Sequence, residues 1–438
     1  MSIEPLLNNK INSVIALYSN GQIQEALDAV ETLIKSYPNE ALLFNISGAC
    51  FAGLRQLDNA VKSYEKALTI KPDYAEVHYN LGVTLQELGQ LSAAVKSYEQ
   101  ALAIKPDYAI ACNNLGFTLQ ELGQLNAAVK SYEQALAIKP DYADVHNNLG
   151  NTLKDLGQLD AAVKSYKQAL AINPDYADVH NNLGVTFQEL GQHDAAVKSF
   201  EQALAIKPDF ADVHYNLGNV HKKLNQLDAA VKCFEQALAI KPDYADAHNN
   251  LGNALKDLGQ LDAAVKCYEM AVAIKPDFAQ VHQNHGSVMK RLKRLDKALT
   301  SFERALVLNP ELNFLLGDLL HSKMLLCLWD DLTNDLNELT KKINNNEKVI
   351  EPFSMLALID DPEIQRKTAE IFANKNYPKN HDLPEIGLYP KHKKIRIGYF
   401  SADFREHPVS ALTAELYEIH DRSHFEIYGF SFGPDTKD

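Results

Sequence analysis

Residues 142–174 read YADVHNNLGNTLKDLGQLDAAVKSYKQALAINP, and this stretch decides the fold. Apolar side chains recur at helical spacing in residues 145–156 and again in 162–172, as in two amphipathic helices. Gly157 between them suits the left-handed backbone that ends many helices, and Pro174 stops the second helix because it has no N–H to donate. The stretch therefore predicts one pair of antiparallel helices.

The same pattern repeats at a fixed interval of 34 residues, which is clearest in its prolines. The row comprises Pro38, Pro72, Pro106, Pro140, Pro174, Pro208, Pro242, Pro276 and Pro310. One helix pair is too small to bury its apolar face alone, so units at this interval are expected to stack into a solenoid. We count nine units over residues 7–312; the first is degenerate because Val14 stands where the others carry glycine.

Each later unit also carries a glycine in its first helix, and an alanine and an aromatic residue in its second. The glycines are Gly48, Gly82, Gly116, Gly150, Gly184, Gly218, Gly252 and Gly286; the alanines are Ala60, Ala94, Ala128, Ala162, Ala196, Ala230, Ala264 and Ala298; the aromatics are Tyr64, Tyr98, Tyr132, Tyr166, Phe200, Phe234, Tyr268 and Phe302. Glycine destabilises a helix interior by about 1 kcal/mol relative to alanine, so its recurrence needs a packing reason. We expect the glycines to face the alanines, with the aromatic rings filling the core.

The combination of Leu-Gly, alanine, aromatic, alanine and proline in 34 residues resembles the tetratricopeptide repeat. The resemblance implies a mainly α fold, an α-solenoid superhelix whose first helices line a concave, protein-binding groove. Residues 313–345 resemble a tenth, degraded pair. Its first helix, predicted over residues 314–329, is nearly all apolar, so we expect it to be buried against the segments that follow.

Asparagines form a ladder on the face that this resemblance places inside the groove. The ladder consists of Asn80, Asn114, Asn148, Asn182, Asn216, Asn250 and Asn284. A primary amide has both a donor and an acceptor, as a peptide backbone does, and a repeat step of ~10 Å matches about three residues of an extended chain. The ladder therefore predicts binding of extended polypeptide. The alternative is that these amides bond neighbouring helices and stabilise the stack.

A histidine row and five cysteines invite a metal hypothesis. The histidines are His78, His146, His180, His214, His248 and His282. Zinc needs all its ligands within ~2 Å of one point, whereas these histidines stand a whole repeat apart, so we expect interface residues and no metal. The cysteines form no CxxC pair, which favours free thiols over a disulfide framework.

The bulk composition excludes several classes of partner. A net charge of −14 argues against sequence-independent binding of nucleic acid. The N-terminus lacks the basic and apolar regions of a secretory signal, and no apolar run approaches the ~18 residues of a membrane span. We therefore expect a cytoplasmic protein with neither nucleic-acid nor membrane partners.

After the ninth unit the period is lost. Residues 313–393 are interpreted as the degenerate helix pair and a linker, and residues 394–438 as strand, loop, helix and strand. Residues 395–400 and 425–432 have the apolar character of strands, and 408–420 has helical spacing. This order is typical of the opening βαβ unit of a parallel, Rossmann-like sheet.

The segment RIGYFSADFREHP at 396–408, with AELYEIHD at 414–421 and FEIY at 425–428, carries a second resemblance. It is similar to the start of the catalytic region of O-linked N-acetylglucosamine transferases and their bacterial relatives. The resemblance implies transfer of a sugar from a UDP-sugar to serine or threonine of proteins held partly in the repeat groove. It also implies that His407 faces the active site. Ala411 stands near a place where family members often have a second histidine.

Two functions from different classes follow. In the first, the solenoid is the arm of an O-glycosyltransferase that binds extended segments of acceptor proteins. In the second, the chain is a non-enzymatic peptide-binding scaffold that retains a vestige of that enzyme. The sequence has no Gly-rich phosphate loop and no second α/β domain, so we expect no cofactor here and no activity from this chain alone. A UDP-sugar donor is implied only for a longer family member, and homodimerisation stays open.

Overall fold

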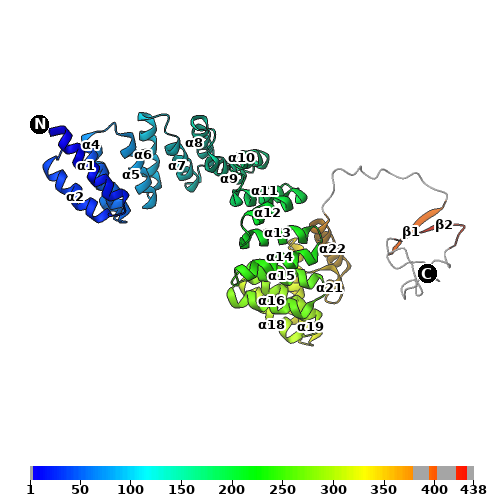
Figure 1. The fold of residues 1–438 in the computed structure, drawn as a ribbon. Helices are drawn as coiled ribbons and strands as arrows, with labels where there is room; N and C mark the ends of the chain where they lie inside the picture. Colours follow the sequence, from blue (N-terminus) through cyan, green and yellow to red (C-terminus); the bar gives the residue numbers. More distant parts are fainter. Residues whose placement is uncertain (1–2, 378–393, 402–420, 432–438) are drawn as a thin grey trace. The chain divides into compact units, whose positions relative to one another are not determined.

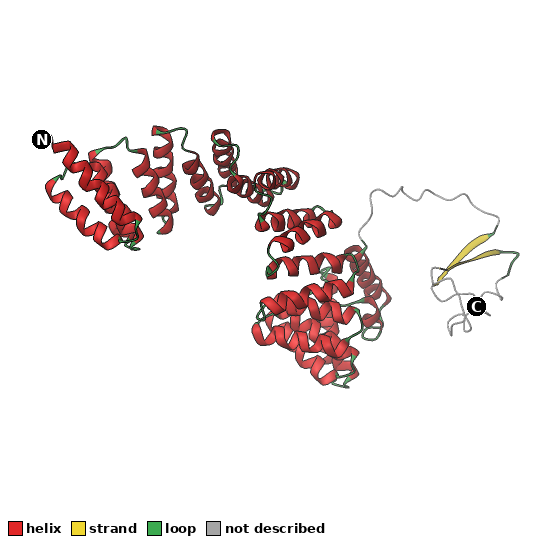
Figure 2. Ribbon diagram, in the orientation of Figure 1, coloured by secondary structure: helices red, strands yellow, loops and turns green. Residues whose placement is uncertain are grey.

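The computed structural model describes residues 3–377, 394–401 and 421–431, and Figures 1 and 2 show how the elements follow one another. The chain divides into two units, Met1–Ile371 and Phe372–Asp438. Described helices make up the first unit, whereas the second contains a two-stranded sheet. The predicted mainly α solenoid with a short α/β segment is confirmed.

Nine consecutive helix pairs fill most of the described part of the first unit. They are α1 (Ile3–Ser19) with α2 (Ile23–Ser36), α3 (Ala41–Gly53) with α4 (Leu57–Ile70), α5 (Ala75–Glu87) with α6 (Leu91–Ile104), α7 (Ala109–Glu121) with α8 (Leu125–Ile138), α9 (Ala143–Asp155) with α10 (Leu159–Ile172), α11 (Ala177–Glu189) with α12 (His193–Ile206), α13 (Ala211–Lys223) with α14 (Leu227–Ile240), α15 (Ala245–Asp257) with α16 (Leu261–Ile274), and α17 (Ala279–Arg291) with α18 (Leu295–Leu308). Each helix packs on its partner and on the adjacent pair, as expected of a solenoid. Throughout the described residues, every helix is too short or too polar to cross a membrane.

A residue with a left-handed backbone lies in the turn between the helices of each pair. Gly157 has a φ of 73°, as its sequence position predicts. At the equivalent position Arg55, Asn225 and Lys293 adopt φ values of 61°, 58° and 59°. Left-handed backbone costs a residue with a Cβ roughly 1–2 kcal/mol, so the packing of the pair imposes this turn even where glycine is missing.

The mid-helix glycines make room for aromatic rings. A Cβ built on Gly150 would lie 2.5, 2.7 and 2.9 Å from Cε1, Cδ1 and Cζ of Tyr166, and the other seven units repeat this arrangement. The expectation that the glycines face the alanines is therefore wrong, because the nearest atoms belong to the ring of the second helix. The Tyr166 side chain is fully buried, so the predicted aromatic core is confirmed.

Four further helices follow the repeats. They are α19 (Leu315–Leu325), α20 (Leu332–Asn344), α21 (Pro352–Leu356) and α22 (Pro362–Asn376). Leu316 and Leu320 of α19 are buried against a cluster that includes Leu339 and Ile350, which confirms that later segments cover this helix. The segment after α20 also contacts the start of α19, where the Phe314 N–H donates to the Lys348 carbonyl at 2.6 Å.

The prediction that the first of these helices reaches residue 329 is wrong. The α-helix ends at Leu325, and Cys327 adopts a left-handed backbone with a φ of 56°. Leu328 and Trp329 lie beyond that break and are 41% and 54% exposed. A run of apolar residues indicates burial without marking where the backbone turns.

The second unit contains two parallel strands, β1 (Ile395–Ser401) and β2 (Phe425–Ser431). They pair in register from Ile395 opposite Phe425 to Ser401 opposite Ser431, which confirms the predicted parallel pairing. Arg396 donates from Nε to Oε2 of Glu426 across the pair at 2.8 Å. The helix predicted over 408–420 lies outside the described residues.

Candidate functional site

The asparagine ladder forms a hydrogen-bonded row that runs from repeat to repeat. Each ladder residue donates from Nδ2 to the residue 35 positions earlier, on the first helix of the preceding pair. Asn148 donates to Asn113 at 3.2 Å, and Asn182 donates to Asn147 at 3.1 Å. The NH₂ group of each ladder amide therefore bonds a neighbouring helix, as expected if the ladder stabilises the stack.

The middle of the ladder keeps both kinds of polar atom without a partner. Among the described residues, the Oδ1 atoms of Asn148, Asn182 and Asn216 accept no hydrogen bond, and the Nδ2 groups of Asn147 and Asn181 donate none. All five side chains are partly exposed. A donor and an acceptor thus recur together on successive repeats. This is the pair of groups that an extended peptide backbone offers.

The residues that directly precede the ladder form a second row, the outer asparagines Asn113, Asn147, Asn181 and Asn249, which two tyrosines interrupt. Tyr79 and Tyr215 accept hydrogen bonds from Asn114 and Asn250 through their hydroxyl groups, at 3.2 and 3.1 Å. In the repeats that follow, the outer amide turns to its neighbour: Asn113 donates to Oδ1 of Asn114 at 3.1 Å. The amide of Asn114 is therefore satisfied at both ends. Asn250 is satisfied in the same way, so neither of these two ladder residues keeps a free acceptor, unlike Asn148, Asn182 and Asn216.

A second set of asparagines supports the ladder and was not singled out by its sequence. Asn151 accepts from Asn182 at 3.1 Å and from the hydroxyl of Tyr166 at 2.8 Å. Asn219 accepts from Asn250 at 2.8 Å. Each stands directly after a mid-helix glycine, where some other units carry an apolar residue. Because asparagine occurs at this position in only some of the units, the fixed 34-residue spacing did not reveal this set.

The histidine row closes the loops between repeats. Each of the six histidines places Nε2 2.9–3.0 Å from the carbonyl oxygen of the proline six residues earlier, as His146 does with Pro140. The bond joins the end of one pair to the start of the next, which agrees with the expected interface role. In the described ranges, no three His, Cys, Asp or Glu side chains are grouped to hold a metal ion.

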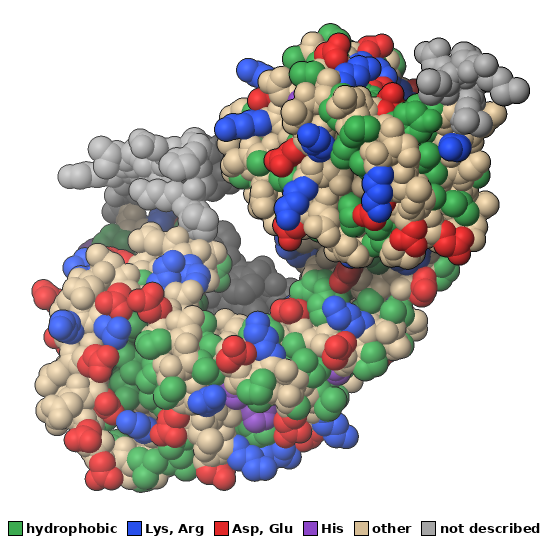
Figure 3. Space-filling view, turned by 90° about the vertical axis from the view of Figure 1, so that its left-hand side faces the viewer, with side chains coloured by type: hydrophobic (Ala, Val, Ile, Leu, Met, Phe, Trp, Pro, Cys, Tyr) green, Lys and Arg blue, Asp and Glu red, His purple; other side chains and the backbone are tan. Residues whose placement is uncertain are grey.

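Positive and negative side chains are mixed on the face of the molecule shown in Figure 3, where Lys and Arg are interspersed with Asp and Glu. Several lysines are also engaged locally, for example Lys139, whose Nζ lies 4.6 Å from the ring centre of Tyr142. Recognition through amide hydrogen bonds fits this mixed surface better than long-range attraction.

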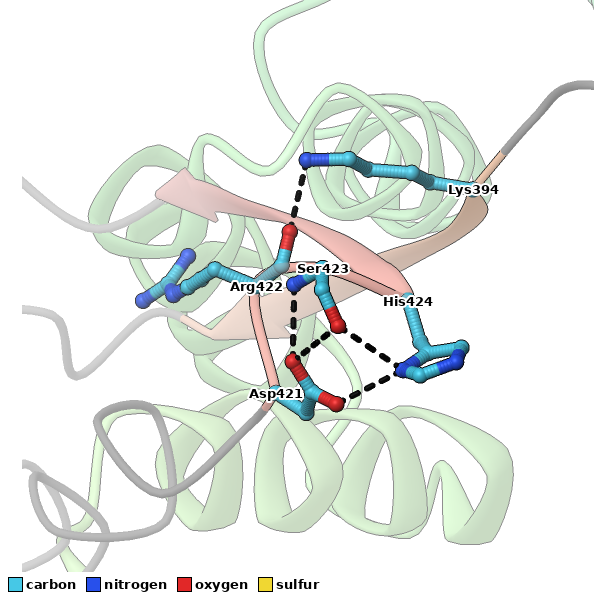
Figure 4. A network of polar contacts seen from close by, with 5 residues as sticks. All are labelled: Lys394, Asp421, Arg422, Ser423 and His424. Carbon is cyan, nitrogen blue, oxygen red and sulfur yellow. Dashed lines mark hydrogen bonds and ion pairs between the residues drawn. The ribbon is translucent and has the colours of Figure 1, made fainter.

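The candidate catalytic residue His407 lies outside the described residues, so its role stays a prediction. A different polar cluster precedes β2, and Figure 4 shows it. Asp421 accepts from the N–H and hydroxyl of Ser423 at 2.8 and 2.6 Å, and His424 Nδ1 lies 2.6 Å from its other carboxylate oxygen. The hydrogen bonds from Ser423 and His424 lower the pKa of Asp421.

This Asp-Ser-His cluster is not arranged for nucleophilic catalysis. In a catalytic triad the serine and the carboxylate bond opposite nitrogens of the imidazole ring. Here Ser423 Oγ and Asp421 Oδ2 both lie next to Nδ1 of His424, at 2.9 and 2.6 Å. The cluster also sits at the N-terminal end of the strand, whereas ligands of open α/β sheets bind at the carboxyl ends. We assign this cluster a structural role, in fixing the turn at which β2 begins.

Comparison with known proteins matches two families. Models described as TPR repeat and tetratricopeptide repeat match successive segments from residue 55 to 312, over half of the chain. A model described as Glycosyl transferase family 41 matches residues 376–438.

Two curated relatives match parts of the chain. A probable UDP-N-acetylglucosamine–peptide N-acetylglucosaminyltransferase from Arabidopsis thaliana is 30% identical over 131 residues, covering 26% of this chain and 13% of that protein. A peroxisomal targeting signal receptor from Candida glabrata is 31% identical over 84 residues, covering 17% of this chain and 14% of that protein. The matched segments therefore span only a small part of either relative.

Solved structures give partial similarity. YrrB, described as a TPR protein with an unusual peptide-binding site, is 23% identical with a TM-score of 0.39, covering 45% of this chain and 99% of that one. A crystal structure of MamA is 27% identical with a TM-score of 0.36, covering 37% of this chain and 95% of that one.

Proposed function

Because this chain is a tetratricopeptide-repeat protein whose C-terminal residues match glycosyl transferase family 41, we propose that its solenoid holds extended segments of acceptor proteins for O-glycosylation. The observation that carries the proposal is the joining, in one chain, of a repeat array and a glycosyltransferase segment. The donor is a UDP-sugar, with N-acetylglucosamine favoured by the described activity of the Arabidopsis thaliana relative.

The ladder supplies the means of holding the acceptor. Unpaired carbonyl oxygens at Asn148, Asn182 and Asn216 face the ligand's N–H groups, and the free donors of Asn147 and Asn181 face its carbonyls. Because these contacts address the backbone, they accept many sequences around the modified serine or threonine. Asn113 and Asn249 donate to Asn114 and Asn250 within the chain, so we expect these repeats to contribute less to peptide binding.

Backbone recognition has a direct test. A fluorescent 20-residue peptide of Gly, Ser, Thr and Ala should bind the full chain, and N-methylation of alternate peptide bonds should weaken binding because it removes N–H donors. Reordering the side chains of the same peptide should change affinity little. Tolerance of N-methylation combined with sensitivity to side-chain order would refute recognition through the backbone.

His407 is proposed to act at the sugar-transfer centre, beside the N-terminus of the helix predicted from Pro408. A helix N-terminus favours the neutral form of a nearby histidine, which suits hydrogen bonding or proton transfer. In a form of the protein with a whole family 41 region, His407→Ala should lower sugar transfer strongly and leave the melting of the repeats unchanged. Unchanged transfer would remove His407 from the mechanism.

A further inference from the structure

Four residues that break the 34-residue pattern gather at one pocket between the eighth and ninth repeats. The pocket has a volume of about 470 Å³ and lies between α16, α17 and α18, near the end of the repeat array labelled in Figure 1. Its lining residues are Glu269, Val272, Ala273, His282, His285, Thr300, Ser301 and Arg304. Ordinary positions of the repeat supply the remainder, so the departures from the pattern are what distinguish this pocket.

The departures remove bulk and install polar groups. Val272 stands where most second helices carry leucine, and Thr300 stands where seven carry lysine, so two side chains become smaller. His285 replaces the buried leucine that precedes the mid-helix glycine in the six preceding repeats. Arg304 replaces the glutamine or methionine of the six preceding repeats. A shallow space lined by apolar, hydroxyl, imidazole and guanidinium groups results.

His285 is held with one nitrogen satisfied and the other without a partner. Its Nδ1 lies 2.9 Å from Ser301 Oγ, and the Ser301 hydroxyl donates its hydrogen bond to the Lys297 carbonyl at 2.8 Å. Nδ1 must therefore carry the hydrogen, which leaves Nε2 as an acceptor in the neutral ring. Among the described residues, Nε2 is shielded from solvent and has no hydrogen-bond partner. Burying an acceptor in this way destabilises a repeat unless a ligand's donor supplies the missing bond.

We propose that this pocket binds a carboxyl group carried on an apolar body, together with one proton. When the His285 ring tilts toward the pocket and uncovers Nε2, the carboxyl group shares its proton with that nitrogen. Arg304 binds the second oxygen, and Val272 and Ala273 contact the apolar part. A guanidinium group is well suited to a carboxylate oxygen. Because acid and proton enter together, the pocket gains no net charge. This avoids repulsion by Glu269, which occurs at the same position in most repeats.

Binding should therefore depend on pH. Burial, as the main cause, lowers the pKa of His285, and His282 and Lys297 lower it further, while Glu269 raises it. Arg304 also faces the pocket and keeps its charge at all working pH values. With His285 neutral in the free protein, uptake of one proton makes affinity fall by up to about tenfold for each pH unit gained.

Isothermal titration of the full chain with benzoate and with neutral benzamide tests the site. Benzoate should bind and benzamide should not, and binding should be tighter at pH 6 than at pH 8. His285→Leu restores the residue of the six preceding repeats, so it should fold at least as well and lose benzoate binding by about tenfold or more. Arg304→Gln, also a restored repeat residue, should weaken binding.

His193→Leu is the matched control, since His193 also replaces a leucine of the pattern and has a buried, unpartnered Nδ1. It lies in another repeat and should leave benzoate binding unchanged. An acetylated pentapeptide ending in leucine, with its carboxyl end free or amidated, distinguishes a protein chain end from a small acid as the source. Equal benzoate affinity in wild type and His285→Leu, affinity independent of pH, or no binding at millimolar benzoate would overturn the proposal.

Discussion

Replacing Gly150 by alanine tests the packing rule that shapes every repeat. The new Cβ would lie 2.5–2.9 Å from three ring atoms of Tyr166, where carbon atoms normally approach to 3.5–4.0 Å, so the ring must move by about 1 Å. Tyr166 has no exposed surface, and its hydroxyl donates to Asn151 at 2.8 Å, so movement also strains a hydrogen bond. Overpacking costs about 1–3 kcal/mol and helix propensity returns about 1 kcal/mol. We expect a net loss of up to about 2 kcal/mol.

Two measurements on the full chain report this loss. Urea unfolding followed by circular dichroism gives the overall stability, and native-state hydrogen exchange of peptides from α9 and α10 gives the local value. In a Tyr166→Ala background the same Gly150→Ala change should become stabilising, because only its helix propensity remains. A higher urea midpoint for Gly150→Ala alone, or the same sign in both backgrounds, would refute the ring-clash explanation.

Two other predictions concern titrating groups. Burial raises the pKa of the Cys112 thiol to about 11, and that of Cys50 likewise. At pH 8 the reactive thiolate is therefore scarce at both, so iodoacetamide should label the exposed Cys327 first, as read by peptide mass spectrometry; equal rates would contradict this. The hydrogen bond from Arg396 lowers the pKa of Glu426. A lowered carboxyl pKa stabilises the strand pair above the unfolded value near 4.5, and this contribution disappears as pH falls through the lower folded value. Hydrogen exchange in β1 and β2 should accelerate over that range in wild type and lose this pH dependence in Glu426→Gln.

The repeat pattern predicted the helix pairs because the same arrangement of apolar residues, glycine and proline recurs in nine units. Gly157 marked its turn correctly, since a left-handed backbone has few acceptable residues. The prediction that Gly150 packs against an alanine was wrong, because the spacing of residues along one helix does not show which side chain of the neighbouring helix contacts it. The true partner is a large ring, Tyr166, rather than a small alanine.

The ladder was recognisable in the sequence, but its bonding was not. Asn182 meets Asn147 at a separation of 35, one more than the period, because the contact joins successive units through their stacking. That geometry depends on how repeats rotate against each other, which no single repeat encodes. The unmatched polar atoms of Asn148 and Asn181 emerge only after these bonds are assigned.

The central claim is that the middle of the asparagine ladder binds peptide backbone. The most direct measurement is fluorescence anisotropy of the 20-residue peptide with two double variants. Asn148→Ala with Asn182→Ala removes unpaired acceptors, whereas Asn114→Ala with Asn250→Ala removes amides already satisfied within the chain. Both variants lose comparable bonds between repeats, so stability should change alike.

At about 0.5–1.5 kcal/mol for each lost hydrogen bond, the first variant should bind the peptide about tenfold more weakly, and the second should stay within about twofold of wild type. Circular dichroism should confirm that both keep their helices. Equal affinities in wild type and the Asn148/Asn182 variant, with helices intact, would contradict the proposed role of the ladder.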